Sequence, residues 1–582
     1  SEEAAQLNNL GIVYRQKGDL INAENVFAKA LSIDKKLGSP EGKAYDLRNL
    51  GINFFLRGDI ELAQRTLEDA LRLSREIGNK YNEVQTLLAL GRLLESKDPK
   101  KSLELFITST NKALKLNIPE AAWQSYFGQG RLQQKLGQIE QAQRLYKNAI
   151  DIARQMTRRG DIGSGQLGRD ELYAQSIELA LEQNNHGYAF QIMELARMQE
   201  HFDIVKGLPI NQLQGSRLHL LHRALKHSEK AETSLPKQPS FKKLLKSSPL
   251  LAQSILNKPV TFTEFRTQLD DESIVVSLFL GPKKLYSLIF DKTNSFTQIT
   301  DLTNSDFRNR LRKLRAKFNA FASVDAELNW LSTFFTLPSP EAWQNKKRLV
   351  ILPHADLEFI PFSALKTATG LVLDRWRISY SPHATFLSSL LKTKLKPRNL
   401  LKVRALANDK SVPFAKLEVE SVGTNIFKSS HLNIKELLSN KGEDVLHIAA
   451  HSKSHVEKRL GQSIILGQNN ENQVRLNIGS ILSARKTPLM VTLSACETAF
   501  SFYNSEKHLS LRDAFFMAGT KTVIGTLGRV SDLSTALFMK HFYRLARTSD
   551  LETAFHHAKQ HIRKIYPHPS YWAPIVMAGD YR

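Results

Sequence analysis

The chain has 582 residues, of which 42% are hydrophobic and 24% are charged, as in an ordinary globular protein. This composition excludes a wholly disordered chain, a collagen-like chain and a disulfide-stapled mini-protein, and the length allows about three to five domains. The longest strongly apolar stretch lies near Ile274–Leu280 and is far shorter than the ~20 residues of a membrane-spanning helix. The N-terminus has no basic segment followed by an apolar one, so we expect no signal peptide and no membrane partner.

The 81 basic and 57 acidic side chains give a net charge of +24, which is spread unevenly. Residues 1–200 hold 27 basic and 26 acidic side chains, whereas residues 201–582 hold 54 and 31. A basic C-terminal part favours an acidic partner or a nucleic acid, although a solvated surface explains it equally well. The single cysteine, Cys496, excludes an intrachain disulfide and a four-cysteine zinc site, and it fits a reducing cytoplasm.

A repeated pattern of small and aromatic residues occupies the first part of the chain. Glycines at positions 11, 51, 91 and 130 recur 40, 40 and 39 residues apart. In the first copy we expect Gly11 to lie where two helices cross, Phe27 to fill the seam between them and Gly18 to lie in the turn. This period resembles the tetratricopeptide repeat and predicts helical hairpins over residues 1–157 that stack into a solenoid with a concave surface.

Residues 158–259 are predicted to form a linker followed by a basic helical extension. The linker contains Gly163-x-Gly165-x-x-Gly168, but this pattern follows a helical segment, so we interpret it as a connector rather than a dinucleotide site. From residue 260 on, short β-branched runs alternate with helical segments, which predicts an α/β sandwich with a mostly parallel sheet. The length favours two lobes, residues 260–400 and 401–582. The expected strands are Ser273–Phe279, Leu285–Phe290, Arg348–Leu352, Val445–Ala449, Met490–Leu493 and Thr522–Gly525.

Two of these strands end at reactive side chains. His451 follows the strand Val445–Ala449, and Cys496 follows the strand Met490–Leu493. Active groups of open α/β sheets collect beyond the carboxyl ends of the strands, and an imidazole beside a thiol promotes the nucleophilic thiolate. We therefore expect Cys496 as nucleophile, His451 as general base, and the backbone amides of Ser452 and Cys496 as donors to an oxyanion. A small core cysteine is the simpler alternative.

We expect no metal and no cofactor. His447, His451 and His455 are spaced four residues apart, but His447 lies in a predicted strand, where side chains alternate with a period of two, and no carboxylate motif accompanies them. We expect His447 to be structural. His557 and His561 are expected on the solvated face of a C-terminal helix.

At these residues the chain resembles the CHAT family, caspase-like peptidases associated with tetratricopeptide repeats, over roughly residues 260–582. The segment Leu493-Ser494-Ala495-Cys496-Glu497-Thr498 agrees with the nucleophile motif of that family residue for residue. The other matching segments are Leu352-Pro353-His354, Pro361-Phe362, His447-x-x-x-His451, Ala518-Gly519, Val530 with Asp532, Phe542-Tyr543, and Tyr571-Trp572-Ala573 with Gly579 and Asp580.

The chain also departs from the family pattern. Ser452 and Ala499 stand where the family usually has glycine, and Gly528 stands where it usually has tryptophan. These departures leave the pair of His451 and Cys496 intact. They bear on the choice of substrate and on the catalytic rate. His354 falls in what looks like an inactive first lobe, where we expect it to be structural.

The resemblance implies a fold in which a solenoid of tetratricopeptide repeats precedes a caspase-like α/β sandwich whose second lobe is active. It implies a cysteine endopeptidase that cleaves a protein partner, with His451 as general base and Cys496 as nucleophile. A protein or peptide on the concave face of the repeats would regulate it. Similar bacterial proteins act in defence or programmed cell death, some beside CRISPR ribonucleoproteins or gasdermin-like substrates.

Two rival hypotheses stay open. One is a catalytically degenerate scaffold of the same family that binds protein or ribonucleoprotein partners. The other is contact with nucleic acid, without sequence-specific readout, through a set of basic residues: Lys242, Lys243, Lys246, Arg310, Arg312, Lys313 and Arg315.

The candidates for a substrate pocket are Glu497, Arg529 and Asp532. Acidic side chains would suit a lysine or arginine of the substrate, and Arg529 would suit an acidic residue. The spacing of these residues does not choose between the two.

Overall fold

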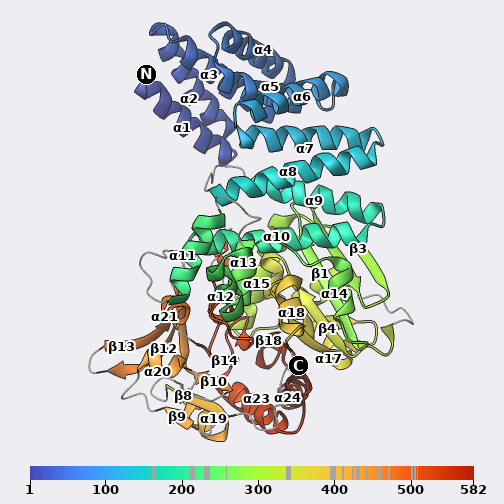
Figure 1. Ribbon diagram of the computed structural model, residues 1–582, viewed down its shortest axis with the longest axis vertical. Helices are drawn as coiled ribbons and strands as arrows, with labels where there is room; N and C mark the ends of the chain where they lie inside the picture. Colours follow the sequence, from blue (N-terminus) through green and yellow to red (C-terminus); the bar gives the residue numbers. More distant parts are fainter. Residues whose placement is uncertain are drawn as a thin grey trace. The chain divides into compact units, whose positions relative to one another are not determined.

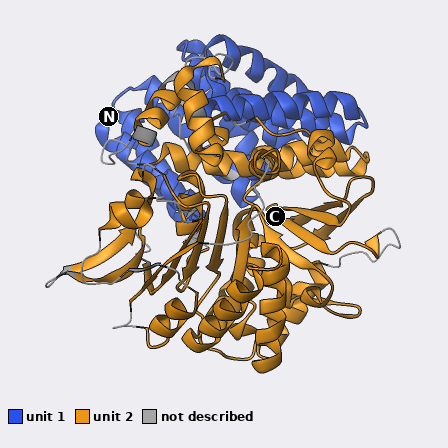
Figure 2. Cartoon of the chain, turned by 60° about the horizontal axis from the view of Figure 1, so that its bottom comes forward, with its two compact units in different colours: residues 1–172 blue, residues 173–582 orange. Residues whose placement is uncertain are grey.

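The computed structural model describes residues 1–159, 166–208, 216–228, 236–256, 258–335, 343–393, 402–408, 412–422, 425–427, 433–439, 444–454, 460–469, 472–484, 486–499, 502–503, 506–507 and 509–582. The chain divides into two compact units, residues 1–172 and 173–582 (Figure 2). The predicted boundaries at residues 157, 259 and 400 divide the chain more finely than this and stay predictions.

The first unit is a stack of helical hairpins (Figure 1). Within it, α1 packs on α2, α3 on α4, α5 on α6 and α7 on α8, and each hairpin packs on the next. The predicted helical repeats are therefore confirmed. The helices are α1 (Glu2–Gln16), α2 (Leu20–Lys36), α3 (Pro40–Arg57), α4 (Ile60–Glu76), α5 (Lys80–Leu94), α6 (Pro99–Lys115), α7 (Pro119–Lys135) and α8 (Ile139–Arg159), and α9 (Gln166–Glu182) begins in this unit.

The recurring glycines lie where the paired helices touch. A Cβ atom on Gly11 would lie 2.4 Å from the ring of Phe27, and a Cβ atom on Gly130 would lie 2.4 Å from the ring of Tyr146. Both rings are fully buried. Gly18 lies in the first turn with φ at 81°, in the left-handed region that favours glycine. Of the glycine pattern in the predicted linker, Gly168 lies in α9, and the first two glycines lie outside the described residues.

The second unit is built on one 11-stranded sheet of the order β3-β2-β1-β4-β7-β18-β17-β14-β10-β8-β9. Neighbouring strands are parallel except in the pairs β1–β2, β2–β3 and β17–β18, so the predicted mostly parallel sheet is confirmed. The strands are β1 (Ser273–Leu280), β2 (Lys284–Phe290), β3 (Ser295–Asp301), β4 (Arg348–Leu352), β7 (Arg377–Tyr380), β8 (Val403–Ala407), β9 (Asn425–Phe427), β10 (Val445–Ala449), β14 (Met490–Ser494), β17 (Thr522–Thr526) and β18 (Ile575–Gly579).

In the part of the chain that the structure describes, three smaller sheets accompany the large one. One of them, β11-β12-β13, continues directly from β10 and carries His451 at its first position. The strands of the small sheets are β5 (Lys366–Thr367), β6 (Gly370–Leu371), β11 (His451–Ser454), β12 (Gln462–Asn469), β13 (Asn472–Asn477), β15 (Phe502–Tyr503) and β16 (Glu506–Lys507).

Helices cover both faces of the large sheet (Figure 2). One group contains α17, α19, α23 and α24, and the other contains α10, α13, α18 and α22. The central strands β4, β10, β14, β17 and β18 are buried at every position, which is why their sequences lack polar alternation.

The helices of this unit are α10 (His186–Lys206), α11 (Ser216–Ser228), α12 (Pro239–Ser247), α13 (Pro249–Leu256), α14 (Phe262–Thr267), α15 (Asn304–Asn319), α16 (Asp325–Phe334), α17 (Val372–Arg375), α18 (Ala384–Leu391), α19 (Ala415–Val422), α20 (Ile434–Leu438), α21 (Ile478–Ser483), α22 (Leu511–Met517), α23 (Asp532–Leu545) and α24 (Leu551–Ile565). The short helices η4 (Ala355–Phe359), η5 (Phe362–Ala364) and η7 (Pro569–Tyr571) complete it.

A buried arginine ties helix α10 to the sheet. The guanidinium of Arg197 donates to the carbonyl oxygens of Leu278 at 2.8 Å and Leu352 at 3.2 Å, at the carboxyl ends of β1 and β4. Glu194 pairs with the same guanidinium at 2.8 Å, so the buried charge is neutralised. Across the described ranges, no helix has both the length and the apolar character needed to cross a bilayer.

The contact at Gly130 gives a test of the repeat packing. Gly130→Ala adds a methyl group against the buried ring of Tyr146, and overpacking of this kind costs about 1–3 kcal/mol. Hydrogen exchange of the α7 and α8 amides should therefore become faster. The control is Gly187→Ala in α10, where the nearest atoms to the new Cβ lie at 3.9 Å and the change should be neutral or stabilising. Equal exchange in the two variants would contradict this packing.

Candidate active site

The two strand ends that carry His451 and Cys496 are neighbours in the sheet. Strands β10 and β14 are parallel, and Ala449 is opposite Ser494 in their register. The N–H of Ala450 donates to the carbonyl oxygen of Ser494 at 3.3 Å, just beyond the ladder. Because His451 and Cys496 each lie two residues beyond these paired positions, the chain delivers both side chains to the same edge of the sheet.

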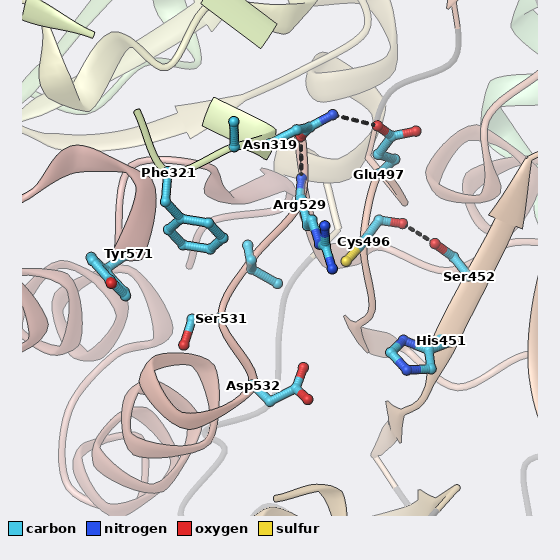
Figure 3. A pocket seen from close by; sticks show the side chains of 12 residues that line it. Asn319, Phe321, His451, Ser452, Cys496, Glu497, Arg529, Ser531, Asp532 and Tyr571 are labelled. Atoms are coloured by element: carbon cyan, nitrogen blue, oxygen red, sulfur yellow. Dashed lines mark hydrogen bonds between the residues drawn. The ribbon is translucent and has the colours of Figure 1, made fainter. Parts of the chain in front are cut away.

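Both side chains extend into one cleft of about 770 Å³ (Figure 3). Cys496 is partly exposed there and is not enclosed in the core. The cleft contains all six residues predicted for the site, and it adds residues that the sequence did not single out. The lining residues are Asn319, Ala320, Phe321, His451, Ser452, Cys496, Glu497, Arg529, Val530, Ser531, Asp532 and Tyr571.

The end of β17 holds the nucleophile turn, which we define as residues 495–499. Thr526 makes three of its hydrogen bonds. Its hydroxyl donates to the carbonyl oxygen of Ala495 at 2.6 Å, its N–H donates to the hydroxyl of Thr498 at 3.1 Å, and its carbonyl oxygen accepts the N–H of Ala499 at 3.0 Å. The backbone on both sides of Cys496 is therefore fixed by one neighbouring strand.

Glu497, directly after the nucleophile, has a left-handed backbone with φ at 54°. A non-glycine residue in such a conformation costs of the order of 1–3 kcal/mol and persists only where its surroundings hold it. Here the N–H of Glu497 donates to the carbonyl oxygen of Gly528 at 3.2 Å, and its own carbonyl oxygen accepts from the side chain of Gln462 at 3.1 Å. The carboxylate pairs with Arg315 at 2.8 Å.

The last residue of α15, Asn319, bridges two segments of the cleft. Its side-chain NH₂ donates to the Glu497 carboxylate at 3.2 Å, and its side-chain oxygen accepts the N–H of Arg529 at 2.8 Å (Figure 3). A Cβ atom on Gly528 would lie 3.1 Å from the side-chain oxygen of Asn319. Because glycine has no Cβ atom, this position leaves room for the Asn319 side chain. The departure from the family pattern at Gly528 thus accompanies a contact that fixes the cleft.

Sequence reasoning missed Asn319 and Gln462 and gave Arg315 a different role. Arg315 belonged to the basic residues of the nucleic-acid hypothesis, and in the structure its guanidinium pairs with the Glu497 carboxylate. The contact between α15 and the nucleophile turn joins residues about 180 positions apart in the sequence. No pattern of neighbouring residues in the sequence predicts such a long-range contact. The other predicted basic residues, Lys242, Lys243, Lys246, Arg310, Arg312 and Lys313, are exposed.

Ser452 replaces the usual glycine after the histidine, and its side chain has a contact of its own. The hydroxyl of Ser452 donates to the carbonyl oxygen of Cys496 (Figure 3). Strand β11 pairs with β12 so that His451 is opposite Ile465 and Ser452 is opposite Ile464. The departure at Ser452 therefore links the segment of the imidazole to the segment of the thiol.

Burial raises the pKa of the Cys496 thiol above its usual range. The carboxylates of Glu497 and Asp532 raise this pKa further, while the backbone N–H of Val530 and the cation of Arg529 lower it. The thiol is therefore protonated near neutral pH and needs a base to become a nucleophile.

The other histidines have structural surroundings. His447 is fully buried, with one ring nitrogen 2.9 Å from the Glu418 carboxylate and the other 3.2 Å from the Tyr543 hydroxyl. His354 is buried, and its ring stacks on the ring of Phe279 with the two centroids 4.2 Å apart. Its Nδ1 accepts a hydrogen bond from the backbone N–H of Leu280. Both surroundings agree with the structural roles expected from the sequence.

His557 and His561 are exposed on α24, on the solvated face that was expected. His455 lies outside the described residues. Within the residues that the structure describes, no group of three or more histidine, cysteine, aspartate or glutamate side chains is arranged to hold a metal ion.

Comparison with protein families matches residues 321–580 to the CHAT domain. Residues 2–76 and 124–156 match tetratricopeptide repeats. A comparison with curated proteins gave no match.

Several solved structures are similar to the chain at low sequence identity. A chain of the Saccharomyces cerevisiae separase–securin complex is 10% identical with a TM-score of 0.40, and the alignment covers 99% of this chain and 53% of that one. The apo form of RapI is 17% identical with a TM-score of 0.29, over 42% of this chain and 84% of RapI. BtubC from P. vanneervenii is 16% identical with a TM-score of 0.27, over 32% of this chain and 74% of BtubC. The chain thus spans about half the length of the separase–securin chain that it matches.

A helical repeat unit that precedes a mixed α/β sheet domain defines the class of this chain. The chain carries tetratricopeptide repeats followed by a CHAT domain of the caspase-like peptidase family, which confirms the resemblance to TPR-CHAT proteins.

The bridge at Asn319 can be tested directly. Asn319→Ala removes the acceptor of the Arg529 N–H and a donor to Glu497, and each lost bond of this kind is worth about 1 kcal/mol. Hydrogen exchange of the Arg529 amide should become roughly five- to tenfold faster. The matched control is Asn309→Ala, an exposed asparagine on the same helix, which should leave that exchange unchanged. Equal exchange of the Arg529 backbone amide in both variants would show that Asn319 does not hold this segment of the cleft.

The raised pKa of Cys496 predicts how its reactivity depends on pH. Because only the thiolate reacts, the rate of alkylation by iodoacetamide should rise with pH to a midpoint above about 8.5, the value of an unperturbed cysteine. Asp532→Asn removes a negative charge that disfavours the thiolate, so the midpoint should fall. Asp325→Asn, an exposed aspartate of α16, is the control and should not move it. A wild-type midpoint below about 7 would show a preformed thiolate–imidazolium pair and would contradict this result.

Proposed function

We propose that the CHAT domain is a cysteine endopeptidase in which Cys496 is the nucleophile and His451 is the general base. One observation carries the proposal: a thiol and an imidazole 45 residues apart in the sequence line the same cleft at the end of two neighbouring strands. The cleft volume of about 770 Å³ lies in the range of small-molecule and side-chain binding pockets. Partial exposure of the sulfur gives a substrate access to it.

The chemistry begins from a protonated thiol. His451 takes the proton from Sγ as the sulfur attacks the carbonyl carbon of the scissile bond, and the electrons of the C=O bond move to the oxygen. His451 then gives the proton to the leaving amine, the C–N bond breaks, and a thioester to Cys496 remains. Water attacks the thioester with His451 as base, which releases the acid and restores the thiol.

The oxyanion of both steps needs donors that are already in place, because a fixed donor costs no reorganisation during the reaction. We assign this role to the backbone amides of Ser452 and Cys496. No residue among those the structure describes accepts a hydrogen bond from the Cys496 N–H, so this amide is available to the substrate. The hydrogen bonds of the nucleophile turn support the assignment because they fix the direction of that N–H.

The repeats supply recognition in this proposal. Tetratricopeptide repeats are typical protein-binding modules, and a partner on their concave face would control when the peptidase acts. We place the protein in the cytoplasm, in bacterial defence or programmed cell death, with a protein substrate of the gasdermin-like kind or beside a CRISPR ribonucleoprotein. The exposed basic residues of α12 and α15 would then make the ribonucleoprotein contact.

A degenerate scaffold is the second candidate function. The raised pKa of Cys496 favours it, because a protonated thiol is a poor nucleophile unless a base acts on it. The same fold would then bind partners without cleaving them.

Cleavage assays with the products of neighbouring genes, with and without nucleic acid, separate these two functions. Cys496→Ala should abolish cleavage, and His451→Ala should lower its rate by about 10²–10⁴-fold because the general base is lost. His557→Ala removes an exposed histidine of α24 and should stay within twofold of the wild type. Cleavage that survives Cys496→Ala would overturn the peptidase proposal, and a wild-type thiol that reacts with no peptide probe would favour the scaffold.

A further inference from the structure

Three charged side chains line the cleft. Among the residues that the structure describes, only one of these side chains is half-buried and has no ion-pair or hydrogen-bond partner. The carboxylate of Glu497 is neutralised by Arg315 at 2.8 Å and receives a hydrogen bond from Asn319 at 3.2 Å. Asp532 is half-buried at the first position of α23, and no residue in the described ranges forms an ion pair or a hydrogen bond with its side chain. Arg529, in contrast, is exposed.

Asp532 is more buried than Arg529, and this difference determines whether the cleft favours a positively or a negatively charged ligand group. An exposed guanidinium is well hydrated and gains little from an ion pair, because water screens the attraction between charges at the surface. A half-buried carboxylate has lost part of its hydration and gains more from a cation that enters the cleft. The electrostatic preference of the cleft is therefore for a positively charged group at Asp532.

The wall of the cleft suits a long side chain that ends in a cation. The rings of Phe321 and Tyr571 lie 5.2 Å apart and are tilted by 47°, and both line the cleft beside Ser531 and Asp532 (Figure 3). Aromatic faces pack against the methylene stem of lysine or arginine and attract the cation itself. In the same view, the sulfur of Cys496 and the imidazole of His451 extend into this cleft from the other strand ends.

We propose that this cleft takes the side chain of a lysine or arginine immediately before the scissile bond, and that Asp532 is the residue that recognises it. The inference rests on the proposed peptidase function, because it names the substrate class of the same cleft. Of the two substrate residues that the sequence left open, basic or acidic, the proposal selects the basic one.

Recognition at Asp532 would also act on the nucleophile. The Asp532 carboxylate raises the pKa of Cys496, so a cation bound beside it cancels that effect and lowers the pKa. A basic substrate residue thereby increases the population of the thiolate that attacks it. An acidic residue would add a further negative charge near the sulfur and would raise the pKa of Cys496.

Asp532 also begins a helix, where a carboxylate stabilises the N-terminal end of the helix without any ligand. Asp325 has the same position at the start of α16 but is exposed and does not line the cleft. It therefore provides a matched control for the loss of a carboxylate from a helix N-terminus.

The test uses four tripeptidyl acyloxymethyl ketones that differ only in the last residue: arginine, lysine, leucine or aspartate. The Cys496 sulfur displaces the carboxylate of such a probe and forms a thioether. Intact-mass spectrometry then measures the fraction of the protein that carries the probe. In the full-length wild type, the arginine and lysine probes should react at least tenfold faster than the leucine probe, because leucine cannot form a charged hydrogen bond with Asp532. Asp532→Asn should lower the arginine rate about tenfold relative to the leucine rate, and Asp325→Asn should leave that ratio unchanged.

Arg529→Gln gives the reciprocal control and should maintain or increase the ratio of arginine to leucine labelling. A leucine or aspartate probe that reacts as fast as the arginine probe would overturn the assignment of Asp532 and leave the peptidase proposal standing. An arginine preference that survives Asp532→Asn would also overturn the role of Asp532. If none of the four probes labels Cys496, both proposals fail.

Discussion

The backbone of the nucleophile turn, residues 495–499, is the constraint on which the site depends. Its left-handed residue, Glu497, turns the chain sharply directly after Cys496, and this conformation is unfavourable for a residue with a side chain. Thr526 holds the turn from the neighbouring strand, and Arg315 and Asn319 hold it from α15. The position of the sulfur is thus fixed by contacts from segments far apart in the sequence.

Residues 260–400 hold the nucleophile turn in place and, through Phe321, line the cleft. They supply Arg315 and Asn319, and they supply Glu358, which pairs at 2.7 Å with the buried guanidinium of Arg512. The N–H of Arg512 donates to the carbonyl oxygen of Thr498 at 3.2 Å, so this buried pair also reaches the nucleophile turn. The cost of desolvating such a buried pair offsets much of the attraction between its charges.

The strands predicted from the sequence are buried along nearly their whole length, and their uninterrupted apolar runs are typical of strands covered on both faces. The same runs predicted where His451 and Cys496 would meet, because parallel neighbours end at one edge of a sheet. Strand β18 was not predicted, although it is buried at every position. Strand β3 was missed because each of its positions is half-buried or exposed, so its sequence has no apolar run. The roles of Asn319 and Arg315 were missed because each depends on a long-range contact, and a basic helix such as α15 is equally typical of a solvated or phosphate-binding surface.

The central claim is that the imidazole of His451 drives attack by the sulfur of Cys496, and the most direct test is to trap the acyl intermediate. A reactive peptide ester that ends in arginine, quenched with acid within a single turnover, should leave an acyl group on Cys496 that intact-mass and peptide mass spectrometry detect. The account predicts rapid acylation of the wild type and acylation slowed by a factor of about 10² or more in His451→Ala. Acylation that proceeds equally without the imidazole, or that falls on a residue other than Cys496, would contradict it.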